Sequence, residues 1–163
     1  MSDQPAAADY ARLTPDILLA AVDTLGYRTS GQLLALNSYE NRVYQVGLED
    51  ATPLIVKFYR PHRWSDAAIL EEHSFTLELA EHEIPVVAPL QSAQTTLHRH
   101  ADYRYAVYPR QGGHWPELGS REERLWMGRF IGRIHAVGAA RVFARGAGDK
   151  RSSADERPPQ RGR

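Results

Sequence analysis

Lys57 is the residue of this sequence whose chemistry most needs an explanation. It stands in the run Leu54–Tyr59, where every other residue is aliphatic or aromatic. Side chains alternate along a strand, so Ile55, Lys57 and Tyr59 share one face, and both faces of the strand are apolar. A lysine held among such side chains requires an anion, and either a carboxylate or a phosphate would serve. The alternative is an edge strand whose lysine extends to water.

Two adjacent carboxylates, Glu71 and Glu72, offer an anion from the protein itself. They lie in a helical stretch that is predicted to start at Ser65-Asp66 and to run to about His82, before Ile84-Pro85 ends it. Successive residues are about 100° apart around a helix, so only one of the two carboxylates can face the sheet. From the residues alone, either glutamate could be the partner of Lys57.

Composition limits the class of protein. The chain has 163 residues, 42% of them hydrophobic, which is enough for one core of ordinary size. It has no cysteine, which excludes disulfides and thiolate metal sites. No stretch approaches the roughly 18 apolar residues needed to cross a bilayer. The N-terminus lacks the basic and apolar segments of a secretory signal, so we expect a cytoplasmic protein.

The elements that must position these residues alternate between helix and strand, an α+β pattern. The first helix is predicted to start at Thr14-Pro15 and to end at Gly26. The predicted strands cover residues 33–36, 42–48, 54–59, 86–90, 95–100 and 103–108, and the first three form a meander. The capping box Ser120-x-x-Glu123 starts a last helix through Val137. Its buried side is expected to consist of Met127, Ile131 and Ile134.

The connection between the first two strands, residues 37–41, is rich in asparagine and serine. These side chains bond to local backbone and leave N–H groups free to point outward. Such a loop could cover phosphates, although it contains no glycine. An ordinary turn is the alternative.

The last part of the chain differs in composition from the rest. Residues 141–163 carry seven basic and three acidic side chains, so this tail has a charge of +4 although the whole chain is neutral. Residues 139–163 contain few large apolar side chains and are expected to be disordered. A nucleic-acid-binding arm is the alternative, and a steep salt dependence of binding would identify it.

Several strings of this sequence resemble the bacterial stress response kinase A family. The strings are Leu36–Gln45, Val56–Pro61 with Trp64, Ile69–His73, Ile84–Pro89 and Gly128–His135. That family comprises serine/threonine protein kinases of the aminoglycoside-phosphotransferase-like fold. The resemblance runs from about Leu13 to Gly138. It implies the N-terminal lobe of a protein-kinase-like enzyme: an antiparallel sheet of about five strands, a regulatory-type helix, an extra N-terminal helix and a linker helix.

The resemblance also implies a role for individual residues. Lys57 would contact the α- and β-phosphates of ATP, in the way that kinases use a strand lysine. Its partner would be Glu72, where the family's helix glutamate falls when counted back from Ile84-Pro85, with Glu71 as the reserve. The phosphate-covering loop would comprise Ser38, Tyr39, Glu40 and Asn41. The hinge, residues 107–111, would offer backbone groups to adenine from Val107, Tyr108 and Pro109.

The resemblance stops before the family's catalytic loop and its magnesium-binding aspartate, which belong to a C-terminal lobe. Nothing after Gly138 matches either motif, and the tail resembles out-of-frame translation. We therefore expect a truncated or frameshifted chain, without catalytic residues or metal ligands and inactive alone. The Met127, Ile131 and Ile134 side of the last helix should normally pack against the missing lobe, so we expect it to be exposed in this chain. Its parts would be a flexible N-terminus at 1–12, a kinase-like N-lobe at 13–110, a hinge with the first C-lobe helix at 111–138, and the tail.

The cofactors implied by the family are ATP and Mg²⁺, and the partner of a full-length member would be a protein substrate. We expect a monomer that binds neither nucleic acid nor membrane. Two alternatives remain open at this point. The chain could be a fragment of a small-molecule kinase that acts on an aminoglycoside-like or choline-like acceptor, or a non-catalytic nucleotide-binding or interaction module.

Overall fold

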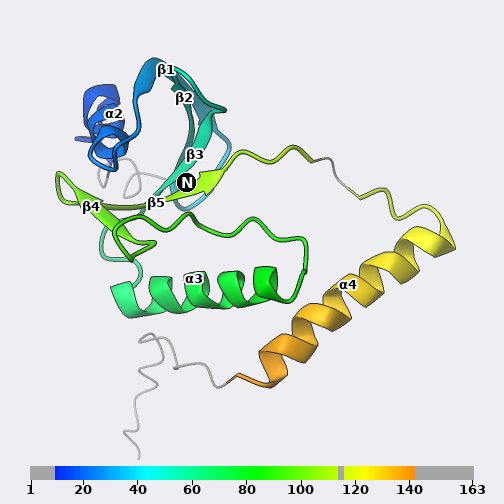
Figure 1. The fold of residues 1–163 in the computed structure, drawn as a ribbon. Helices are drawn as coiled ribbons and strands as arrows, with labels where there is room; N and C mark the ends of the chain where they lie inside the picture. The colour runs from blue at the N-terminus through cyan, green and yellow to red at the C-terminus, as the bar shows by residue number, and fades with distance from the viewer. Residues whose placement is uncertain (1–9, 114–115, 142–163) are drawn as a thin grey trace, which may run out of the picture.

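Figure 1 shows the fold in a computed structural model, which describes residues 10–113 and 116–141. The elements in chain order are α2 (Pro15–Asp23), β1 (Thr29–Leu36), β2 (Arg42–Leu48), β3 (Leu54–Tyr59), α3 (Asp66–Glu81), β4 (His98–His100), β5 (Tyr103–Pro109) and α4 (Arg121–Ala139). The looseness expected for residues 1–9 and most of the disorder expected for residues 139–163 concern parts of the chain outside the described residues. Residues 139–141 are described: α4 ends at Ala139, and Arg141 Nη1 lies 2.8 Å from Glu78 Oε2.

The five strands form one antiparallel sheet in the order β1-β2-β3-β5-β4. β3 is the central strand, and Lys57 lies between Val43 of β2 and Ala106 of β5. Lys57 is therefore not on an edge strand. A lysine in this position cannot reach water along the strand edge, so its ammonium group must be accommodated on the face of the sheet.

The two faces of the sheet are covered by different helices, as Figure 1 shows for α2 and α3. α2 packs Leu18, Ala21 and Val22 into the larger core, which contains Val56 and Phe58 of β3. The second core is smaller and comprises Tyr59, Ile69 and Ala106. The alternation along β3 thus directs Val56 and Phe58 toward α2, and Lys57 and Tyr59 toward α3.

Tyr10 belongs to the larger core although the sequence placed it in a segment expected to be loose. It is 7% exposed and stacks on Tyr103, with 6.2 Å between ring centroids. Its hydroxyl donates to the carbonyl oxygen of Phe58 at 3.2 Å. The aromatic ring is buried and stacked, and the hydroxyl has a hydrogen-bond acceptor, so Tyr10 is held against the sheet.

Helix starts follow the sequence closely. Thr14 caps α2, and the Ser65 hydroxyl accepts the N–H of Ala68 at 3.2 Å at the start of α3. Ser120 and Glu123 form the expected capping box of α4. One helix end differs, because α2 has Thr24 rather than Gly26 as its C-cap. The Thr24 hydroxyl donates back to the carbonyl of Ala21 at 2.7 Å and so satisfies a terminal acceptor.

The strand predicted at residues 86–90 is wrong. This segment has no ladder pairing, and the backbone hydrogen bond that joins it to the sheet is that of 2.7 Å from the Leu90 N–H to the carbonyl of Val107. Pro85 and Pro89 lack the N–H groups that a ladder requires, which explains the outcome. The following hairpin is also shorter than predicted, since β4 begins only at His98.

α4 lies apart from the sheet and meets the end of α3 (Figure 1). Met127, Ile131 and Ile134 were expected to be left uncovered in this chain, and indeed no residue of α4 is buried. The helix is attached through Arg133, which donates to the carbonyls of His82 and Glu83 at 2.9 and 3.2 Å. Among the described residues, no helix is long and apolar enough to cross a membrane.

The central strand generates a test of the fold. Phe58→Ala should lower the free energy of unfolding by about 3–5 kcal/mol, because Phe58 is fully buried between Tyr105 and Tyr44. Leu34→Ala on β1 is the control, since Leu34 is 56% exposed and should change stability by less than about 0.5 kcal/mol. Urea denaturation measures both. Equal losses in the two variants would contradict this core assignment.

Candidate functional site

The structure pairs Lys57 of β3 with Glu72 of α3. The distance from Lys57 Nζ to Glu72 Oε1 is 3.3 Å. The prediction that these residues lie within ion-pair reach is confirmed, and the pairing residue is Glu72 rather than Glu71. The Lys57 side chain is 22% exposed and that of Glu72 is 57% exposed. The ammonium group is therefore partly enclosed, while the carboxylate stands at the rim.

Tyr59 forms part of the wall around the ammonium group. It lies two residues after Lys57 on the same face of β3, and Lys57 Nζ is 4.8 Å from the centroid of its ring. A cation over an aromatic face is stabilised by the charge distribution of the ring. Lys57 is thus held between a carboxylate and an aromatic ring, with its charge directed off the sheet.

A buried polar network adjoins this pair. His73 follows Glu72 on α3 and is only 1% exposed. The distance between His73 Nε2 and the Tyr59 hydroxyl is 2.6 Å, and between His73 Nδ1 and the Thr96 hydroxyl 2.8 Å. The Tyr108 hydroxyl lies 3.3 Å from that of Tyr59 and 3.4 Å from His73 Nε2. Both ring nitrogens of His73 therefore have partners.

Burial controls the protonation of this network. It lowers the pKa of His73 to about 4, so the imidazole is neutral near pH 7. Burial also raises the pKa of Tyr59 and of Tyr108 above that of free tyrosine, so both keep their protons. A neutral imidazole with one donor and one acceptor nitrogen can bond both Tyr59 and Thr96. The network carries no charge beside Lys57.

The loop expected to cover phosphates is fastened to the chain that follows β3. The Asn41 side-chain oxygen accepts the N–H of Arg60 at 3.2 Å, and the Glu40 carboxylate pairs with Arg63. Tyr39 is 94% exposed, and Ser38 is half-buried. Glu40 and Asn41 are therefore anchors of the loop. Its backbone and Ser38 and Tyr39 are the groups left to meet a ligand.

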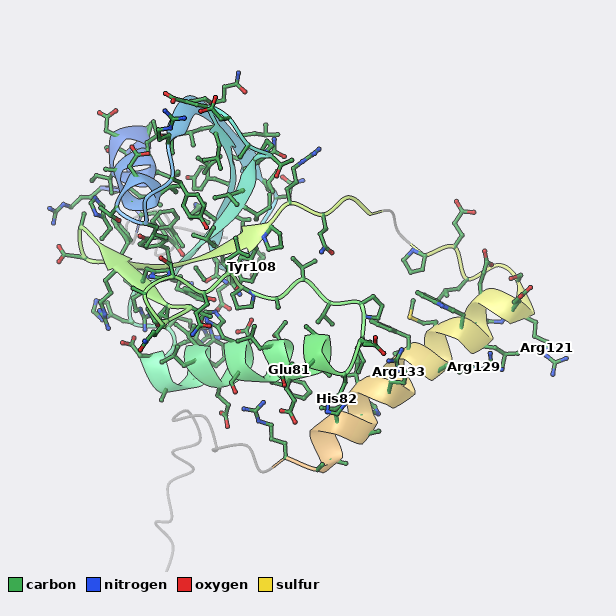
Figure 2. The ribbon with its side chains drawn as sticks, in the orientation of Figure 1. Glu81, His82, Tyr108, Arg121, Arg129 and Arg133 are labelled. Carbon is green, nitrogen blue, oxygen red and sulfur yellow. The ribbon has the colours of Figure 1, made fainter. Side chains whose placement is uncertain are left out.

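The expected hinge residues Val107, Tyr108 and Pro109 end β5. Val107 is buried, and its carbonyl already accepts the Leu90 N–H. Figure 2 shows Tyr108 at the end of β5, on the side of the sheet where α3 lies. The hinge is thus connected to the Lys57 site through the Tyr108 hydroxyl. Within residues 10–113 and 116–141, no cluster of three or more His, Asp or Glu side chains could hold a metal ion.

Sequence reasoning missed the network while finding the ion pair beside it. Tyr59 and His73 could have been predicted to lie near the site, since each is close along the chain to a residue of the ion pair. Thr96 and Tyr108 gave no such signal, because they come from a connection and a strand whose proximity depends on the folded sheet.

Comparisons with known proteins concern the family and the fold. The model of the family described as "Phosphotransferase enzyme family" matches residues 32–162. Stress response kinase A of Salmonella choleraesuis is 44% identical over 137 residues, and that of Escherichia coli 42%. The serine/threonine protein kinase RdoA of Salmonella typhimurium is 43% identical. Each alignment covers 84% of this chain but 42% of the relative, so the chain spans less than half the length of these relatives.

A solved structure shares the fold. It is described as amicoumacin kinase hAmiN in complex with AMP-PNP, Ca²⁺ and Ami, with a TM-score of 0.67 and 22% sequence identity. The match covers 87% of this chain and 44% of that chain. At this identity the likeness shows the fold alone. It confirms the kinase-like N-lobe architecture that the sequence predicted.

The buried histidine generates a pH prediction. The ordinary pKa of 6.5 falls to about 4 in the folded chain, so unfolding takes up a proton between these values. The free energy of unfolding therefore has its full value above pH 6.5. It decreases by about 3 kcal/mol as the pH falls toward 4. His73→Gln cannot take up this proton, so its free energy of unfolding should fall less over this range.

Urea denaturation at a series of pH values measures both proteins. His98, whose pKa burial also lowers, is present in both and cancels in the difference. Parallel stability curves for the wild-type chain and His73→Gln would show that His73 is not buried as the structure places it.

Proposed function

Because this chain belongs to the phosphotransferase enzyme family, we propose that Lys57 and Glu72 are the phosphate-binding pair of an ATP-dependent kinase. The observation that carries the proposal is the 3.3 Å pair between a central strand and the helix that covers it. In the full-length protein the acceptor would be a serine or threonine hydroxyl of a protein. Relatives named as stress response kinase A and as a serine/threonine protein kinase support that acceptor class.

Stability alone does not explain the pair. An ion pair with an exposed partner contributes only about 0–1 kcal/mol to folding. Lys57 would instead use its point charge to neutralise phosphate oxygens, and Glu72 would fix the direction of the ammonium group before the ligand arrives. Such preorganisation matters in phosphoryl transfer, where the protein contributes mainly positioning and electrostatic stabilisation.

The remaining parts of the nucleotide site would surround this pair. The backbone of residues 38–41 would cover the phosphates, since the Glu40 and Asn41 side chains hold that loop in place. Backbone groups of Tyr108 and Pro109 would meet adenine, with Val107 as their buried support. When bound, Mg²⁺ would neutralise phosphate oxygens. The described residues do not fit a metal-binding cluster, and we assign no protein ligand to it.

The acceptor class separates this proposal from its close alternative. A small-molecule kinase would use the same nucleotide lobe, as the fold shared with a protein described as an amicoumacin kinase illustrates. The named relatives at 42–44% identity favour a protein acceptor. A cytoplasmic location follows from the same proposal, since ATP is the co-substrate.

The first prediction concerns ATP binding by the 163-residue chain. We expect weak binding, because the described residues supply one wall of a nucleotide site. Millimolar ATP should shift the amide resonances of residues 38–41, Tyr108, Arg110 and Gln111, and Lys57→Ala should need a higher ATP concentration for the same shifts. Lys150→Ala is the matched control, since Lys57 and Lys150 are the two lysines of the chain. An unchanged ATP dependence in Lys57→Ala would contradict the proposed site, and a micromolar dissociation constant would contradict the expected weakness.

The second prediction is that these 163 residues alone do not transfer phosphate. Glu72, the carboxylate at the site, is paired with Lys57 and is therefore not placed to orient an acceptor hydroxyl. The purified chain should give no labelled product with labelled ATP, magnesium and a generic protein substrate. Label incorporation above that of the Lys57→Ala variant would overturn this expectation.

A further inference from the structure

Two parallel links join β3 to α3. One is the ion pair of Lys57 with Glu72, and the other is the hydrogen bond between Tyr59 and His73 at 2.6 Å. The strand residues are two apart and so lie on the same face. The helix residues are adjacent, about 100° apart around the axis, so the direction of His73 determines that of Glu72.

α3 has few fully buried apolar side chains to fix its rotation. Its buried residues are Ile69, His73 and Leu79, so a polar side chain occupies the middle of the buried stripe. The ion pair cannot supply the missing constraint, because Glu72 is 57% exposed and such pairs are weak. A buried imidazole that bonds through both nitrogens is directional, and leaving either nitrogen unpaired would cost about 1–3 kcal/mol.

The partners of His73 come from three different parts of the fold. Tyr59 belongs to the central strand, Thr96 to the connection before β4, and Tyr108 to the end of β5. Rotation or outward movement of α3 would break the bonds to all three. The network is also uncharged, because burial holds His73 neutral, so it does not compete with Lys57 for the Glu72 carboxylate.

We propose that His73 is a positioning residue whose bonds to Tyr59, Tyr108 and Thr96 fix the rotation of α3 and thereby hold Glu72 on Lys57. This inference rests on the proposed function, since it names the residue that positions the same ion pair. It also connects the phosphate end of the site to the hinge, because Tyr108 is both a member of the network and a hinge residue.

The test observes Lys57 directly and needs no nucleotide. With Lys150→Arg as background, Lys57 is the single lysine of the chain, and isotope-labelled lysine gives one side-chain NMR signal. Glu72→Gln defines the signal position of the broken pair. In His73→Phe, which keeps a ring but removes both nitrogens, the Lys57 signal should move most of the way to that position.

Matched variants separate positioning from general packing. His98→Phe alters another buried histidine, whose Nε2 has no hydrogen-bond partner among the described residues, and should leave the Lys57 signal in place. His73→Gln can still bond Tyr59 and should restore part of the signal position. Tyr59→Phe keeps the ring beside Lys57 and removes only the hydroxyl. It should also move the Lys57 signal, and it replaces His73→Phe as the test if that variant does not fold.

A folded His73→Phe or Tyr59→Phe chain with an unchanged Lys57 signal would overturn the inference. A signal that does not respond to Glu72→Gln would overturn it as well, since the pair would then be absent in solution. The proposed function fails separately. If ATP shifts nothing in the wild-type chain while Lys57 still responds to His73→Phe, the positioning role stands and the nucleotide role falls.

Discussion

The structure depends on the placement of one ammonium group on the face of a central strand. Lys57 has a neighbouring strand on each side, a core beneath β3 and an aromatic ring beside its charge. Enclosing a charge even partly is costly unless a counter-charge is supplied. Glu72 supplies it from α3, so the helix must be held at one rotation and one height above the sheet. The helix cap at Ser65 and the buried network around His73 serve that requirement.

The same constraint explains the division of the sheet into two faces. The face toward α2 is filled with aromatic and aliphatic side chains and provides most of the core. The face toward α3 has a smaller core and a polar network beside it. The first face supplies stability, and the second keeps an accessible charge in a defined direction. That division places rigidity behind the proposed nucleotide site and polarity within it.

The sequence predicted the elements with strong local signals and failed where tertiary context decided. The caps at Thr14, Ser65 and Ser120 fixed three helix starts because a hydroxyl beside free N–H groups is a local interaction. Residues 86–90 were mistaken for a strand, since a strand is defined by a partner that the sequence does not reveal. Glu72 could be chosen over Glu71 only through a family resemblance, because helix periodicity alone left both open.

The central claim is that Glu72 acts on a bound phosphate through Lys57. A double-mutant cycle on ATP affinity, with Lys57→Met, Glu72→Gln and the double variant followed by NMR titration, tests it most directly. We expect the double variant to lose no more ATP affinity than Lys57→Met alone, because Glu72 then has no lysine left to orient. Losses that add independently would show that the two residues do not work as a pair and would contradict the account.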